Sequence, residues 1–141
     1  MIIQEFTLDK YDWFVRVYYL IDKFPKEDIF GNLMELGCDK DEAFETAESL
    51  EEEGFNVGSI YSNTYRRRSL IVIGKANSTD EFYDTFDHEK GHLAMHICET
   101  DDINPFSEEY QYLTGEIGQE MFPIAKNFLC EHCRQKLKDG N

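Results

Sequence analysis

The segment from Ser78 to Ile97 constrains the fold most strongly, because its apolar residues recur with the period of an α-helix. Ser78 and Glu81 form a capping box, which is typical of a helix start. Plotted at about 100° per residue, one narrow stripe of this helix is apolar and contains Phe82, Phe86, Leu93 and Ile97. A separate stripe, more than a quarter-turn away, contains His88, His92 and His96. The sequence therefore predicts a helix that packs on a core and carries histidines outside that core.

The histidine stripe contains the motif His-Glu-x-x-His, which runs from His88 to His92. A spacing of four residues places both imidazoles on one helix face, where they can share a metal ion, and puts Glu89 beside them to take a proton from water. The chain has only 4 His in 141 residues, and composition alone gives a chance match in about 1% of such chains. Zn²⁺ is the expected metal, because two imidazoles, a carboxylate and an open position form the usual catalytic set.

A third protein ligand has to come from outside this motif. His96 continues the stripe, but ligands at i, i+4 and i+8 of a straight helix span about 12 Å, which is too far for one ion. We therefore expect His96 to line the cleft or to support a ligand. The helix that follows Pro105 offers carboxylates, of which Glu109 borders the apolar edge and is the first candidate. Glu108 and Glu116 are the alternatives.

The pattern His88-Glu89-x-Gly91-His92-x-x-x-His96, followed by Glu109 at the start of an aromatic-rich helix, resembles a known family. It is similar to the small gluzincin-type zinc metallopeptidases of the ImmA/IrrE kind and to short relatives encoded by phages and mobile elements. The resemblance covers the chain from Leu70 to Phe122. It implies zinc on His88, His92 and Glu109, with Glu89 as general base. It also implies a neighbouring strand, here residues 69–73, that binds an extended peptide.

The remaining elements predict an α+β fold in one domain, residues 1–141, with a flexible tail from about residue 135. Residues 13–20 alternate as a strand, and residues 57–61 and 69–73 form a hairpin whose second strand is apolar on both faces and hence central. Helices are expected from Pro25 to Gly37, from Asp39 to Gly54, and from Asn104 to a kink or break at Pro123. The result is a small, mainly antiparallel sheet packed on helices, with a zincin-like pair of helices at the site.

The charge of the chain restricts its partners. With 29 Asp+Glu against 14 Lys+Arg, the formal net charge is -15 at pH 7. Nucleic acids and anionic membranes need Lys and Arg on the contact face, so we expect a peptide or protein substrate instead. The longest aliphatic run, residues 70–73, is too short to cross a bilayer, and the N-terminus lacks the basic start of a signal peptide. We expect a soluble, cytoplasmic protein.

These features favour a zinc-dependent hydrolase, specifically a peptidase. Its oxyanion stabiliser has three candidates, namely Tyr110, Tyr112 and the loop Arg66–Arg68. Two alternatives stay open: a metal-stabilised binding or regulatory protein without turnover, and an acidic protein that binds basic partners. Cys130 and Cys133 form a single CxxC, which is a weak metal signal because a structural zinc site needs two further ligands.

Overall fold

A computed structural model of the chain describes residues 1–54 and 56–139. In this part of the chain, four strands form one mixed sheet: β1 (Ile2–Leu8), β2 (Trp13–Tyr19), β3 (Ser59–Asn63) and β4 (Arg68–Ile73). The strand order is β1-β2-β4-β3, in which β1/β2 and β3/β4 are antiparallel and β2/β4 is parallel. The sheet is mainly antiparallel, as predicted, and β1 and β3 are its two edges.

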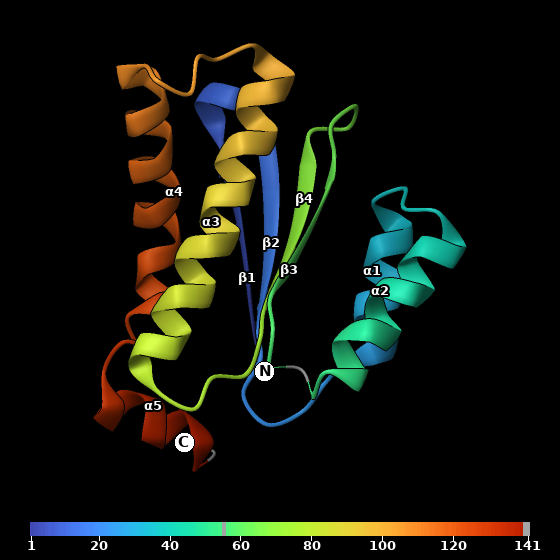
Figure 1. The fold of residues 1–141 in the computed structure, drawn as a ribbon, viewed down its shortest axis with the longest axis vertical. Helices are drawn as coiled ribbons and strands as arrows, with labels where there is room; N and C mark the ends of the chain where they lie inside the picture. Colours follow the sequence, from blue (N-terminus) through green and yellow to red (C-terminus); the bar gives the residue numbers. More distant parts are fainter. Residues whose placement is uncertain (55, 140–141) are drawn as a thin grey trace.

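Helices cover both faces of the sheet (Figure 1). On one face lie α1 (Lys26–Glu35) and α2 (Lys40–Glu52), and on the other lie α3 (Thr79–Asp101) and α4 (Glu108–Ala125), which run antiparallel to each other. The short α5 (Glu131–Lys138) lies beside the start of α3, and the 3₁₀ turn η1 (Asp9–Tyr11) joins β1 to β2. The α+β class is therefore confirmed. Among the described residues, no helix is both long and apolar enough to span a membrane.

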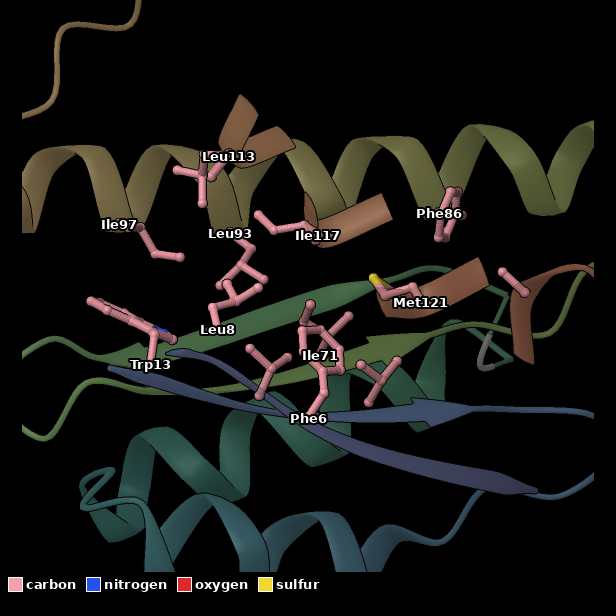
Figure 2. Close-up of a cluster of buried hydrophobic side chains, with 14 of the residues drawn as sticks. Phe6, Leu8, Trp13, Ile71, Phe86, Leu93, Ile97, Leu113, Ile117 and Met121 are labelled. Carbon is pink, nitrogen blue, oxygen red and sulfur yellow. The ribbon is translucent and has the colours of Figure 1, made fainter. Parts of the chain in front are cut away.

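The two central strands, β2 and β4, divide their side chains between two cores, because successive side chains of a strand point to opposite faces. In β4, Ile71 and Ile73 face α3 and α4, while Leu70 and Val72 face α1 and α2. Figure 2 shows the larger core, in which side chains of α3 and α4 meet those of the sheet. The predicted apolar stripe of α3 lies in this core and is almost fully buried: Phe82 at 1%, Phe86 at 7%, Leu93 at 0% and Ile97 at 0% exposure.

Two predicted helix starts are confirmed by their hydrogen bonds, whereas the helix expected from Asn104 begins at Glu108. The Ser78 hydroxyl accepts from the backbone N–H of Glu81 at the start of α3. The Asp39 carboxylate accepts from two backbone N–H groups at the start of α2, those of Asp41 and Glu42. Side chains at the N-cap satisfy donors that the first helical turn leaves free, so these residues fix where each helix begins.

Three elements differ from the predictions. The strand β1 is absent from the predicted elements, although its inward residues Phe6 and Leu8 are buried and its neighbours alternate with them. The helix α4 does not break at Pro123 but runs on to Ala125. A proline so close to a helix end removes only one backbone bond. A flexible tail was expected from about residue 135, but the residues from there to Lys138 form the last turn of α5.

The strand expected to bind a peptide also differs. Residues 69–73 belong to β4, which pairs with β2 on one side and β3 on the other. Its backbone donors and acceptors are used within the sheet, so it has no free edge for a further strand. The free edge next to α3 belongs to β3, because α3 packs over β3 and β4 while α4 packs over β1.

The contact of α3 with the sheet predicts a large difference between two neighbouring positions of the helix. Leu93→Ala should lower the free energy of unfolding by about 2–5 kcal/mol, because it leaves a cavity in the larger core. Met95→Ala, on the exposed side of the same helix, should change it by less than about 0.5 kcal/mol. Urea unfolding of both variants measures this, and equal losses would contradict the packing described here.

Candidate functional site

The histidine pair lies on an exposed face in the middle of α3. The Nε2 atoms of His88 and His92 are 3.1 Å apart, and both side chains are solvent-exposed. Two nitrogens bound to one tetrahedral zinc at about 2.0–2.1 Å lie about 3.3 Å from each other, so this separation suits a shared ion. It equally suits a hydrogen bond in which one neutral ring donates to the other. The pair therefore fits two of the ligands of a zinc ion.

Glu89 of the same motif lies beneath the pair, against the sheet. Its side chain is only 5% exposed, and among the described residues its buried Oε2 atom has no hydrogen-bond partner. Burial raises the pKa of the Glu89 carboxyl, and the positive forms of His88 and His92 lower it by a smaller amount. A carboxylate that is desolvated yet influenced by both imidazoles is in a position to exchange a proton beside them.

Gly58, the residue directly before β3, makes room for this carboxylate. A Cβ atom at Gly58 would lie 2.9 Å from both Cγ and Oε1 of Glu89, and 2.7 Å from Cγ2 of Thr85. Any larger residue at this position would force Glu89 or Thr85 to move. A glycine in a predicted strand often marks such a close approach, so the sequence carried a signal for this contact that the predictions did not use.

The third histidine of the stripe joins α3 to β3. The Nδ1 atom of His96 lies 2.6 Å from the Ser62 hydroxyl, which lies 2.7 Å from the Ser69 hydroxyl. Ser69 is fully buried and accepts from Trp13 Nε1, a group that can only donate. Burial lowers the pKa of His96, the neighbouring His92 lowers it further, and Glu99 opposes both effects. His96 thus links α3 to the edge strand β3, and it lies beside the pair formed by His88 and His92.

The structure does not bring Glu109 to the histidine pair. Glu109 forms an exposed ion pair with Lys10 at 3.9 Å, next to β1. The charges of Glu109 and Glu116 both raise the pKa of Tyr11, in addition to the larger effect of its burial. These carboxylates therefore face the β1 edge of the sheet, whereas His96 and its neighbours face the β3 edge. Glu109 also lies level with the C-terminal end of α3, which is about 13 Å along the helix from His92.

The first turns of α4 also hold Glu108 and the two tyrosines that were candidates for stabilising an oxyanion. Glu108 is exposed, Tyr110 packs against the larger core, and Tyr112 is 69% exposed. Within residues 1–54 and 56–139, no group of three or more His, Cys, Asp or Glu side chains is arranged to hold a metal ion. The described chain thus places two imidazoles and one adjacent carboxylate together on α3.

The arginine loop has a structural partner of its own. Arg67 donates two hydrogen bonds to the Asp101 carboxylate, at 2.7 and 2.8 Å, and others to the carbonyls of Tyr11 and Asp12. Its guanidinium also lies 5.1 Å from the ring of Trp13. Asp101 ends α3, about 20 Å along the helix from His88. The loop therefore fastens the end of α3 to the sheet and lies too far away to act at the histidine pair.

Comparisons of the chain with models of known protein families, with curated proteins and with solved structures found no match. The resemblance to ImmA/IrrE-type metallopeptidases consequently depends on the motif residues alone.

The buried carboxyl predicts how stability varies with pH. Because burial raises the pKa of Glu89, the folded chain binds more protons than the unfolded chain between the ordinary and the raised pKa. The free energy of unfolding should therefore fall as pH rises through this range. Glu89→Gln removes the charge, so it should be more stable than the wild type at about pH 8, with the difference vanishing below about pH 4.

Urea unfolding of both proteins across this range measures the effect. Asp84→Asn, an exposed position of the same helix, is the matched control and should show the pH slope of the wild type. Identical slopes for all three proteins would mean that the Glu89 carboxyl is hydrated in solution.

Proposed function

We propose that this protein is a zinc-dependent peptidase in which His88 and His92 hold the metal and Glu89 is the general base. The observation that carries the proposal is one juxtaposition on α3. Two exposed imidazole nitrogens lie 3.1 Å apart directly beside a buried carboxyl that has an unpartnered oxygen. Neither feature benefits the fold: exposed histidines add little to packing, and a desolvated carboxyl without a partner costs stability. Such costs concentrate at functional sites.

The donor set suits zinc, since two neutral imidazoles with open positions beside them are typical of catalytic centres. When bound, zinc would act as a Lewis acid toward the carbonyl of the peptide bond that is cleaved. Glu89 would take the proton of the attacking water and later give it to the leaving amine. A pKa raised by burial favours this role, because a general base works best when its pKa lies near the working pH.

The edge strand β3 is the part of the fold that suits an extended peptide. Among the described residues β3 pairs only with β4, so within that part of the chain one row of its backbone groups is free to pair with a further strand. This edge already contacts the site, because Gly58, directly before β3, lies against Glu89, and Ser62 of β3 lies against His96. A peptide added to β3 would pass beside the histidine pair. The net charge of -15 also supports a protein substrate over a nucleic acid or an anionic membrane.

A metal-stabilised binding or regulatory protein without turnover is the second candidate. The position of Glu109 favours it, because a catalytic zinc usually has three protein ligands and the described chain brings together two. We place either function in the cytoplasm, where free thiols such as the four cysteines of this chain stay reduced.

The ligand assignment is tested by zinc content after desalting. His88→Ala and His92→Ala should each lose the zinc that the wild type retains, because one imidazole cannot hold the ion. Glu109→Gln should retain it, because Glu109 lies on the opposite flank of α3. The wild-type melting temperature should also fall with a chelator, since zinc binds only the folded chain. Zinc retained by the double histidine variant would refute the site, and zinc lost in Glu109→Gln would restore Glu109 as a ligand.

The catalytic role separates Glu89 from the ligands. Glu89→Gln should keep zinc and fold, yet lose about 10²–10⁴-fold of the peptidase activity, which is typical of the loss of a general base. Cleavage of a peptide library by the zinc-loaded chain, read by mass spectrometry, provides the rate. Glu99→Gln is the control and should cleave like the wild type. If the Glu89 variant matches the wild type while both hold zinc, the non-catalytic candidate is the better account.

A further inference from the structure

Two cysteines lie together at the start of the last helix, outside the site described above. Cys130 is the N-cap residue of α5 and is exposed, and Cys133 lies one turn later and is partly buried. The other thiols, Cys38 and Cys98, are buried in the two separate cores. Cys130 and Cys133 are therefore the pair that a reactant from solution can reach.

A backbone hydrogen bond at the start of α5 holds the two cysteines within one turn of each other. The Cys130 carbonyl accepts from the backbone N–H of Arg134 at 2.8 Å, which closes the first turn of α5. In a closed helical turn, Cα atoms three residues apart are about 5 Å from each other. Unstrained disulfides join Cα atoms that are about 4.4–6.8 Å apart. The spacing of the two residues is therefore within the range that a disulfide can bridge.

The two thiols are unequal. The backbone N–H groups of Cys133 and His132 and the Cys133 thiol itself donate toward the Cys130 sulfur, and these hydrogen bonds lower the pKa of Cys130. The same contact raises the pKa of Cys133, which is also partly desolvated. Cys130 is both the exposed thiol and the one whose pKa is lowered, so it is placed to react first, and Cys133 lies one turn later as the thiol that can react second.

The helix that carries the pair is fixed to the rest of the fold. Arg134 is buried, pairs with Glu131 at 2.8 Å and donates to the carbonyl of Ala76. Glu131 in turn accepts from the backbone N–H of Thr79, the first residue of α3. A structural zinc site would need two further ligands, and no such group surrounds the pair in the described part of the chain.

We propose that Cys130 and Cys133 form a thiol–disulfide exchange site for small, accessible disulfides. The Cys130 thiolate attacks one sulfur of the substrate disulfide, forming a mixed disulfide and releasing the first substrate thiolate, which takes a proton from water. The Cys133 thiol then loses its proton and attacks the Cys130 sulfur, releasing the second substrate thiolate. The substrate disulfide is reduced to two thiols, and the protein dithiol is oxidised to the Cys130–Cys133 disulfide.

The test uses the full chain, reduced and then mixed with glutathione disulfide. After alkylation and mass spectrometry, the wild type should contain a disulfide between Cys130 and Cys133 without bound glutathione. Cys133→Ser should stop at the mixed disulfide and carry glutathione on Cys130. Cys130→Ser should react more slowly than Cys133→Ser, because its remaining thiol is partly buried whereas Cys130 is exposed. Cys98→Ser is the control and should behave like the wild type.

Two results would overturn this proposal. One is a wild type whose cysteines all remain alkylatable, or Cys130→Ser and Cys133→Ser variants that react at equal rates. The other is zinc that the Cys130→Ser variant loses and the His88→Ala variant retains, which would make the pair a metal site. Neither result depends on whether α3 carries a peptidase centre.

Discussion

The packing of α3 on the sheet is the interaction on which the rest of the structure depends. Its apolar stripe, centred on Leu93 and Ile97, is buried against β2 and β4. Each such side chain contributes about 1.5–3 kcal/mol of hydrophobic stabilisation. The stripe is narrow, so the two flanks of the helix meet different neighbours. One flank meets α4, where Lys90 lies against Gly118, and the other meets β3, where His96 lies against Ser62.

This arrangement explains why Glu89 is buried while the histidines beside it are exposed. On a helix, Glu89 is one residue from His88 but lies about 100° around the axis, which turns it toward the sheet. The glycine at position 58 leaves space for its carboxyl between α3 and the edge strand. An uncompensated buried carboxyl destabilises a fold, and chains retain such groups where activity requires them. The same geometry that buries Glu89 thus places it beside the two imidazoles.

Local patterns in the sequence were enough to predict most elements of this fold. The capping residues Ser78 and Asp39 each bind the backbone groups expected of them, and the apolar stripe of α3 is buried as the helical period requires. The strand β1 could also have been predicted, because Ile2, Phe6 and Leu8 share one face. Its signal is weaker because polar Gln4 interrupts that face and pairs with Tyr19.

How elements far apart in the chain pack on one another could not be predicted from such local patterns. Glu109 borders an apolar stripe of α4, as its spacing indicated, but that stripe faces the core beside β1 and not the flank of α3 that carries the histidines. Which flank of α3 meets α4 depends on the strand order, because α4 lies over β1 while β3 lies at the other edge. The prediction that β3 and β4 form a hairpin says nothing about the order of all four strands in the sheet. The proposed peptide-binding edge moved from β4 to β3 for the same reason.

X-ray absorption at the zinc edge of the zinc-loaded chain tests the central claim most directly, because it identifies the atoms around the metal. We expect scattering from two imidazole rings bound at about 2.0–2.1 Å, with the same spectrum in Glu109→Gln. A spectrum without imidazole scattering, or one dominated by sulfur, would show that His88 and His92 do not form the metal centre of this protein.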